Sequence, residues 1–475
     1  MAYVLLRSIF ALSLRAFFRV ADLRGVKRIP QTGPVLLVAN HTNAFVDPLV
    51  ILVNVRRRVT LTAKSTLRAN PLLRLVIAGF GAVLFHRQGD VAEGARPSRN
   101  VDALARCKEI LQAGGALVVF PEGVSHSDPA MRGFRTGAAR IAADYTAATG
   151  RALTVVPIGL HYSRKDRWRS DAVGLVGRPV AVDAGEARDV RALTERMRVW
   201  VEALTLNFAT AEERDLILRA SRLFEYRREG PEPIDRPESL EPEARIDRGQ
   251  RLAEGAHALR RDDPERFDAL ASGAASLTRR LAVLGVEPAE VAISMSPARA
   301  ALFVLRELEI FLVGAPLAAL GWLVHLPPFL LTRRLVAALS ADEDHPASNA
   351  VFLGPPIFLL WWAGVVAVAW IAASAGGAAL AALALPLCGA IALRFRDRAG
   401  GAVRRARTFL LWLRRPELRE RMAGAIEAWQ DAVLEAEAEV AVGGAGTPRV
   451  TLAPVPAPDG RGRRDRNTPP PSAPA

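Results

Sequence analysis

Short apolar segments alternate with segments of helical periodicity between residues 26 and 210. The predicted strands cover residues 35–39, 59–63, 82–85, 116–120, 154–160 and 172–176. Predicted helices lie between them at residues 45–54, 70–79, 99–113 and 136–148, and a closing helix carries Leu193, Met197, Trp200, Leu204 and Phe208 on one face. Because the strands are short, apolar and separated by helices, the pattern predicts a mostly parallel sheet covered by helices on both faces. We expect one α/β domain over residues 26–210.

Much longer apolar runs occupy the region 307–395, which we predict to be transmembrane. The run 310–331 is long enough to cross a bilayer, and the run 356–393 is long enough for two spans around a turn. Basic residues follow directly and, by the positive-inside rule, place this end in the cytoplasm; they are Arg394, Arg396, Arg398, Arg404, Arg405 and Arg407. A catalytic domain on the same side requires an even number of spans. We therefore expect two or three spans, with an odd third segment being re-entrant or interfacial.

The N-terminal segment, residues 1–25, is apolar but is interrupted by Arg7, Arg15 and Arg19, and no small-residue cleavage site follows. It is therefore not typical of a signal peptide. On a helix the three arginines fall within about a third of the circumference. This favours an amphipathic helix lying in the membrane interface; the alternative is a first helix that packs on its own domain.

Three further segments carry no motif to which chemistry can be attached. Residues 211–306 are charged and predict a helical extension after a break rich in proline and glutamate. Residues 396–440 predict a basic amphipathic helix, and residues 441–475 are rich in proline and predict a disordered tail.

The charge of the chain narrows the class of partner. The formal net charge is +14 over 475 residues, which favours nucleic acid, anionic lipid or phosphorylated substrates. The long apolar runs favour the membrane, and no nucleic-acid recognition module is visible. The two cysteines, Cys107 and Cys388, have no metal-ligand spacing and predict neither a zinc site nor a disulfide framework.

Candidate chemistry begins where the strand at 35–39 ends. His41 follows it directly, and Asp47 comes six residues later. An imidazole there can take a proton from a hydroxyl group, and an aspartate on its other nitrogen would fix the tautomer and stabilise the imidazolium. A general base is one interpretation of His41. A histidine satisfied within the structure and a metal ligand are the alternatives.

Three other strand ends add polar or turn-forming groups. The stretch 81-GAVLFHR-87 ends in Arg87, whose planar guanidinium suits a phosphate. The stretch 120-FPEG-123 offers Glu122, which could bind a polyol or pair with an arginine, and Gly123, which lets a backbone approach a ligand. The stretch 154-TVVPIGLHY-162 brings Pro157 to the end of another strand.

Together these stretches resemble the four blocks of the PlsC-like glycerolipid acyltransferases, membrane enzymes that acylate glycerol-3-phosphate or 1-acylglycerol-3-phosphate. The resemblance extends over about residues 30–183. It implies that His41 is the base, Asp47 its orienting carboxylate, and Arg87 the contact to the acceptor phosphate. By the same resemblance the substrate-binding set also contains Glu122, Gly123, Lys64, Arg135 and Pro157.

One departure from the family pattern concerns the first block. Five residues separate His41 from Asp47, whereas the family usually has four. The stretch 41-HTNAFVDP-48 is similar to a variant in fungal-type glycerol-3-phosphate acyltransferases, which weakly favours that acceptor.

The resemblance implies a membrane-bound O-acyltransferase of phospholipid biosynthesis that needs neither a cofactor nor a metal. The donor would be acyl-CoA or an acyl carrier protein thioester, and the catalytic domain would face the cytoplasm. The alternatives are transfer to a lysophospholipid or amino-lipid, and a non-catalytic lipid-binding scaffold. A serine hydrolase is disfavoured because Ser125 lacks the nucleophile-elbow glycine.

Overall fold

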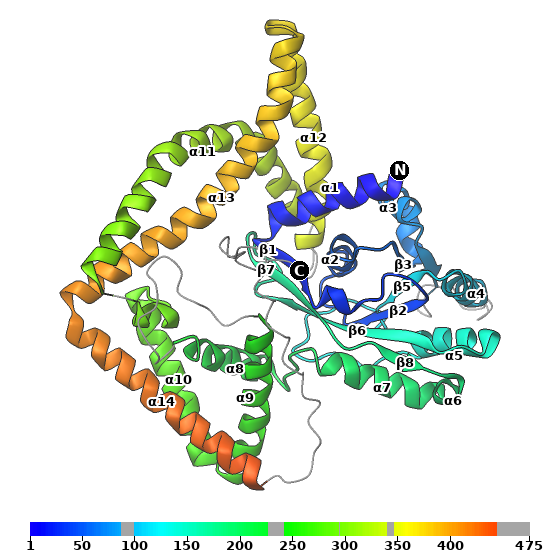
Figure 1. Cartoon of the computed structure of the whole chain (residues 1–475), viewed down its shortest axis with the longest axis horizontal. Helices are drawn as coiled ribbons and strands as arrows, with labels where there is room; N and C mark the ends of the chain where they lie inside the picture. Colours follow the sequence, from blue (N-terminus) through cyan, green and yellow to red (C-terminus); the bar gives the residue numbers. More distant parts are fainter. Residues whose placement is uncertain (87–98, 227–241, 294, 340–345, 444–475) are drawn as a thin grey trace, which may run out of the picture.

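The computed structural model describes residues 1–86, 99–226, 242–293, 295–339 and 346–443. It contains an α/β domain, a bundle of shorter helices and three long helices (Figure 1). The predicted fold class, a mostly parallel sheet followed by a helical extension and apolar C-terminal helices, is confirmed.

Eight strands form the sheet in the order β1-β7-β6-β2-β5-β3-β4, and β8 also pairs with β6. Their bounds are β1 Val20–Arg24, β2 Val35–Ala39, β3 Val59–Lys64, β4 Val83–Phe85, β5 Ala116–Val119, β6 Leu153–Tyr162, β7 Asp171–Val176 and β8 Val180–Val182. All pairs are parallel except those of β6 with β7 and β8. The pattern of apolar runs did not predict β1 or β8, because both are short and β1 carries charged residues at the sheet edge.

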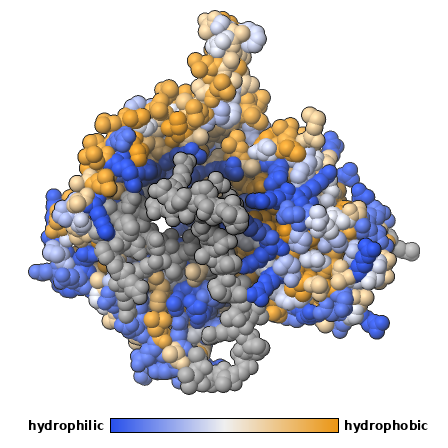
Figure 2. Space-filling model, viewed as in Figure 1, coloured by the Kyte–Doolittle hydropathy of each residue, from blue (hydrophilic) through white to orange (hydrophobic). Residues whose placement is uncertain are grey.

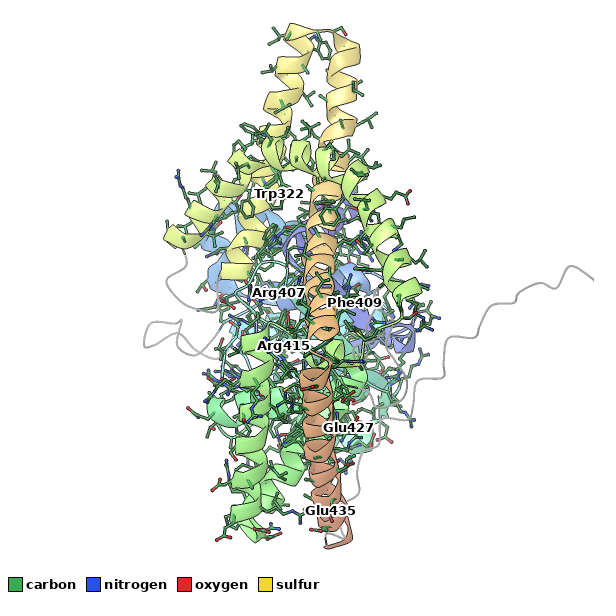
Figure 3. All side chains as sticks on the ribbon, turned by 90° about the vertical axis from the view of Figure 1, so that its left-hand side faces the viewer. Trp322, Arg407, Phe409, Arg415, Glu427 and Glu435 are labelled. Carbon is green, nitrogen blue, oxygen red and sulfur yellow. The ribbon has the colours of Figure 1, made fainter. Side chains whose placement is uncertain are left out.

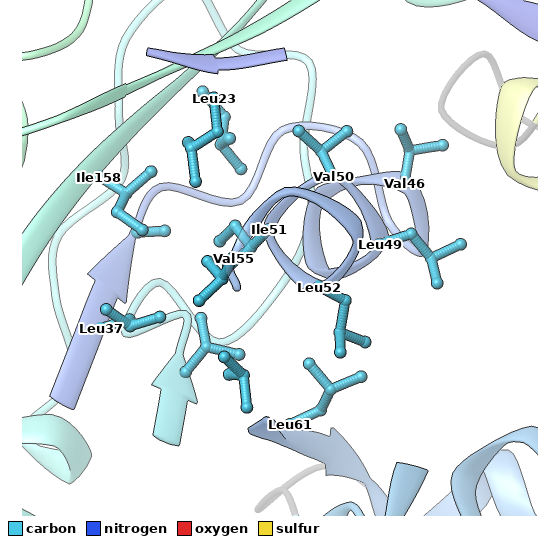
Figure 4. Packing of buried hydrophobic residues seen from close by; sticks show 14 of the residues in the cluster. Leu23, Leu37, Val46, Leu49, Val50, Ile51, Leu52, Val55, Leu61 and Ile158 are labelled. Carbon is cyan, nitrogen blue, oxygen red and sulfur yellow. The ribbon is translucent and has the colours of Figure 1, made fainter. Parts of the chain in front are cut away.

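Helices cover both faces because alternate residues of the central strands enter opposite cores. Leu37 packs in one core with helices α1 (Ala2–Phe17), α2 (Val46–Asn54) and α3 (Pro71–Phe80). Leu36 packs in the other core, whose helices are α4 (Arg99–Gln112), α5 (Gly137–Thr149), α6 (Ala184–Arg188) and α7 (Val190–Glu202). Figure 4 shows α2 lying directly over the strands, with Ile51 and Val55 facing Leu37 and Ile158. This packing fixes where α2 begins, and with it the position of Asp47.

Helix α1 packs by one face on the α/β domain. Phe10 and Leu14 are buried in the core, and Arg7 donates to the carbonyls of Val53 and Val55 at the end of α2. The opposite face leaves other apolar side chains exposed, namely Val4, Leu5 and Leu12. The interfacial position of this helix stays a prediction.

A third core, outside the α/β domain, joins segments far apart in the sequence. Helices α8 (Ala211–Leu223), α9 (Pro242–Asp262) and α10 (Pro264–Leu284) pack with α14 (Pro416–Gly443). In Figure 3, α13 leads from Arg407 and Phe409 through Arg415 into α14, which bears Glu427 and Glu435. The charged extension and the C-terminal amphipathic helix therefore share one hydrophobic core.

The three long helices are α11 (Pro297–Leu339), α12 (Pro346–Ala372) and α13 (Ala375–Arg414), and each is long and apolar enough to cross a membrane. Helices α12 and α13 form a projecting hairpin, whereas α11 is an arch (Figure 1). Hydrophobic residues dominate this part of the visible surface in Figure 2. Prolines lie inside α11 at Pro316, Pro327 and Pro328, where each removes a backbone hydrogen bond and favours a bend.

Candidate active site

His41 and Asp47 meet at the carboxyl end of β2, as their spacing predicts. The loop after the strand carries His41, and the first turn of α2 carries Asp47. His41 Nδ1 lies 2.9 Å from Asp47 Oδ2. Because an ionised carboxylate only accepts hydrogen bonds, Nδ1 carries the proton and Nε2 keeps its lone pair. Among the described residues no group is bonded to Nε2, so this nitrogen is free to accept a proton.

Asp47 is fully buried and accepts four hydrogen bonds. Oδ2 receives the backbone N–H groups of Thr42 and Asn43, each at 2.7 Å, in addition to His41. Oδ1 receives the hydroxyl of Tyr162 at 2.5 Å. Burial, with the charge of Asp47, raises the pKa of Tyr162 well above its usual value, so the phenol stays protonated and donates. The carboxylate is thereby held in one orientation.

Asn40 fixes the strand end that carries the histidine. Its side-chain amide donates to the carbonyl of Leu160 at 3.1 Å and accepts from the N–H of Leu160 at 2.7 Å. The amide thus acts as an extra rung between β2 and β6, the strand that also supplies Tyr162. Sequence analysis missed both Asn40 and Tyr162; the signal for Asn40 was its place beside His41 at a strand end.

Glu122 holds two loops together from the end of β5. It is 2% exposed. Oε1 accepts the backbone N–H of His41 at 2.6 Å, and Oε2 accepts that of Arg132 at 2.8 Å and a short hydrogen bond from His126 Nε2. These bonds occupy the carboxylate, so the geometry favours a role in positioning His41 over direct contact with a polyol.

Gly123 allows an arginine to lie across the same loop. Its φ is +76°, and an added Cβ would lie 2.9 Å from Nε of Arg135. A side chain at this position would therefore be strained and would displace the guanidinium. Gly123 and Arg135 thus lie together beside the end of β5. Phe120, the first residue after β5, stacks on His41 with ring centroids 4.5 Å apart.

The remaining predicted residues lie at different places. Lys64 ends β3 and pairs in register with Phe85 of β4, at the same edge of the sheet as His41. Pro157 is buried within β6, opposite Val38, and not at the end of a strand as expected, because β6 continues to Tyr162. Arg87 lies outside the described residues. The structure thus joins His41, Asp47 and Glu122 by direct bonds and leaves the phosphate contacts as predictions.

The long helices reach the site through the connection between β6 and β7. Trp168 in this connection packs against Trp322 and Phe329 of α11. Arg169 forms a bidentate pair with Asp397 of α13 and donates to the carbonyls of Arg15 and Phe18. The same connection begins directly after Tyr162, so the segment that holds Asp47 is continuous with the segment that holds the C-terminal helices.

The described residues contain no group of three histidine, cysteine or acidic side chains placed to hold a metal ion. The metal-ligand alternative for His41 would need further ligands, and both ring nitrogens of its neighbour His126 are already bonded. His126 donates to Glu122 through Nε2 and accepts the N–H of Asp128 through Nδ1 at 3.2 Å. The geometry instead suits proton transfer at His41 Nε2.

Comparison with known families supports the resemblance. Residues 21–161 match the family model described as Acyltransferase, a segment that contains His41, Asp47, Glu122 and Arg135. The match does not include the helical bundle or the three long helices.

Individual relatives match over limited lengths. The chain is 26% identical over 151 residues to a chloroplastic 1-acyl-sn-glycerol-3-phosphate acyltransferase of Arabidopsis thaliana, covering 32% of this chain and 38% of that protein. It is 35% identical over 85 residues to glycerol-3-phosphate O-acyltransferase 2 of Saccharomyces cerevisiae, covering 18% of this chain and 11% of that protein. The chain thus spans less than two fifths of the length of either relative. The crystal structure of the 1-acyl-sn-glycerophosphate acyltransferase PlsC from Thermotoga maritima is similar at 23% identity and a TM-score of 0.33, covering 42% of this chain and 78% of that one.

Proposed function

We propose, on the premise that residues 21–161 form an acyltransferase domain, that the protein transfers a fatty acyl group from a thioester to a hydroxyl of glycerol-3-phosphate or 1-acylglycerol-3-phosphate. The observation that carries the proposal is the His41–Asp47 pair, which leaves Nε2 of His41 free at the carboxyl end of β2. The names of the relatives supply the two acceptors. Acyl-CoA and an acyl carrier protein are the two candidate donors.

The reaction needs one base and no covalent enzyme intermediate. His41 Nε2 takes the proton of the acceptor hydroxyl as its oxygen attacks the thioester carbonyl carbon. The tetrahedral intermediate then expels the thiolate, which takes the proton from the imidazolium. Asp47 stabilises that imidazolium through Nδ1. An ester and a free thiol leave, and His41 returns to its neutral form.

A backbone amide beside the base is available for the developing oxyanion. The N–H groups of His41, Thr42, Asn43 and Phe45 all have acceptors. Within the part of the chain that the structure describes, the N–H of Ala44 has none. We assign it as an oxyanion donor because it is an unused amide in the loop that follows His41, and such a donor could stabilise negative charge as it develops on the carbonyl oxygen.

The acceptor phosphate is assigned to Arg87, Lys64 and Arg135. Arg135 is exposed beside the His41 loop, and Lys64 stands at the same sheet edge. Guanidinium groups bind phosphate through paired N–H donors, and lysine contributes a point charge. The alternative acceptors, a lysophospholipid or an amino-lipid, carry a different charge where glycerol-3-phosphate and 1-acylglycerol-3-phosphate carry the phosphate.

We base the proposed membrane arrangement on where the long helices are attached. Helix α12 begins on the α/β domain and α13 returns to it at Asp397. The 20 residues of α12 after Phe352 would span about 30 Å, the thickness of a hydrocarbon core. The hairpin would therefore cross twice, with α11 as the interfacial segment. An even number of spans results, with the α/β domain on the cytoplasmic side.

The experiment that tests the function uses full-length protein in detergent with palmitoyl-CoA, or palmitoyl-carrier protein, and each acceptor in turn. Release of free thiol should depend on the acceptor and should be lost in His41→Ala. The matched control is His257→Ala, which changes a half-exposed histidine in the helical bundle and should retain activity. Acceptor-dependent turnover that persists in His41→Ala would overturn the assignment of the base. No turnover with any pairing of donor and acceptor would favour the scaffold.

A further inference from the structure

The loop between the two catalytic residues contains a strained position. Five residues separate His41 from Asp47, and the middle one of them, Ala44, has a φ of +25°. A residue with a Cβ rarely adopts a positive φ unless its surroundings hold it there. Something must therefore fix the loop at or next to Ala44.

The next residue supplies the contact. The backbone N–H of Phe45 donates to Oγ of Ser348 in the first turn of α12, at 3.2 Å. Ser348 is 1% exposed, so no solvent replaces it as an acceptor. The ring of Phe45 also packs against Phe352, one turn further along α12, with centroids 5.0 Å apart. A helix that starts 300 residues later in the chain thus holds the catalytic loop by its backbone and by its side chain.

The first turn of α12 is itself anchored in the core of the α/β domain. Ala347 and Val351 are 2% and 0% exposed and belong to the same cluster as Val46 and Leu49 of α2. On the opposite side, Oγ of Ser13 in α1 donates to the carbonyl of Val351 at 2.8 Å. Ser348 is consequently a fixed point, and its hydroxyl can determine where Phe45 and its neighbours lie.

We propose that Ser348 is a positioning residue of the active site, which holds the loop of residues 42–45 so that the His41–Asp47 pair is assembled only when α12 is docked. The proposal rests on the proposed acyl transfer. Ser348 does not touch the reacting atoms. It acts through the Phe45 N–H, the strained Ala44 and the N–H groups of Thr42 and Asn43, which bind Asp47.

The test compares Ser348→Ala with the wild-type protein in the thioester assay, using full-length chains. We expect kcat to fall about tenfold, the effect of roughly one lost hydrogen bond. KM for donor and acceptor should stay within twofold, because the substrate contacts are untouched. The kcat of Ser348→Thr, which keeps a hydroxyl, should be higher than that of Ser348→Val, whose side chain has the same shape but no hydroxyl. Ser13→Ala is the matched control: it removes a hydrogen bond between α1 and α12 that does not reach the loop, and its kcat should equal that of the wild type.

Each outcome decides a different point. If the wild-type protein shows no turnover, the proposed function is wrong, and the contact between Ser348 and the loop has only a structural role. An active wild type with an equally active Ser348→Ala overturns the positioning role. Equal losses of kcat in Ser348→Ala and Ser13→Ala also overturn it, since docking of α12 alone would then explain both. If Ser348→Ala fails to fold, the comparison of threonine with valine decides in its place.

Discussion

The phenol of Tyr162 donates to Asp47 across 2.5 Å, from a strand 115 residues away in sequence. This contact supplies the fourth donor of a buried carboxylate whose other oxygen orients His41, the proposed base. Tyr162 therefore belongs to the support of the base rather than to the binding of substrate.

Tyr162→Phe should lower kcat about tenfold with little change in KM, because it removes one charge-assisted hydrogen bond from Asp47 and leaves substrate contacts intact. Steady-state kinetics with both substrates measures this. Tyr145→Phe removes a hydroxyl from a buried tyrosine on the other face of the sheet and should leave kcat unchanged. Equal kcat values in the two variants would contradict the role.

Asn40→Leu should destabilise the α/β domain by about 3 kcal/mol, because it leaves the buried N–H and C=O of Leu160 without partners. Denaturant unfolding in detergent, followed by tryptophan fluorescence, measures this loss. Asn54→Leu is the control; the amide nitrogen of Asn54 donates to the carbonyl of Ala21 in β1 at 3.4 Å and to that of Val50 in α2 at 2.9 Å, its oxygen accepts no bond within the described part of the chain that pairs two strands, and the change should cost less. A loss below that of the control would refute the role of Asn40.

The imidazole of His161 should make the protein less stable in mild acid. Burial lowers its pKa to about 4 from 6.5, and Nε2 donates to the carbonyl of Leu204. Between these pH values the unfolded chain binds a proton that the folded protein does not. The contribution, about 3 kcal/mol, is therefore complete above pH 6.5 and is lost as pH falls to 4. Unfolding free energies measured across this range should fall less steeply in His161→Gln; identical slopes would contradict the prediction.

Arg169→Met should weaken the attachment of α13 to the α/β domain by about 3 kcal/mol, because it leaves Asp397 partly buried without its partner. Thermal unfolding in detergent or nanodiscs measures the change. Arg19→Met is the control; the Arg19–Asp171 pair is also bidentate but is more exposed. A pair of that kind contributes about 1 kcal/mol or less. Equal effects of the two changes would show that burial of the first pair is not decisive.

The sequence was sufficient for β2 to β7 and for the helices between them, because wholly apolar strands have one physical interpretation once helices alternate with them; it was not sufficient for β1 and β8. It was also sufficient for His41 and Asp47, which are close in sequence and share one loop. The sequence could not show what surrounds them. Tyr162 and Ser348 reach this loop from 115 and 303 residues away, and a tyrosine in a strand or a serine at a helix start carries no local sign of a distant partner.

For Glu122 the sequence suggested a ligand contact, whereas the folded chain supplies backbone partners. A glutamate after a strand is locally indistinguishable from one that faces a ligand, and only the folded chain shows that the N–H groups of His41 and Arg132 occupy it. The sequence also left the number of membrane spans open, because the length of an apolar run does not show where the ends of the helix are attached. Attachment of α12 and α13 to one domain is a tertiary property.

The burial of Val351 in the core that α1 and α2 form on the sheet has a consequence for how the protein is made. A ribosome releases the N-terminal residues first, yet the hydrophobic core around the catalytic loop is complete only after residue 352 has emerged. The nascent α/β domain must wait, with part of its core uncovered, while the translation of α8 to α11 proceeds. Assembly of the loop between His41 and Asp47 thus depends on the arrival of the α12–α13 hairpin, and a fragment ending at residue 210 would lack part of its own interior.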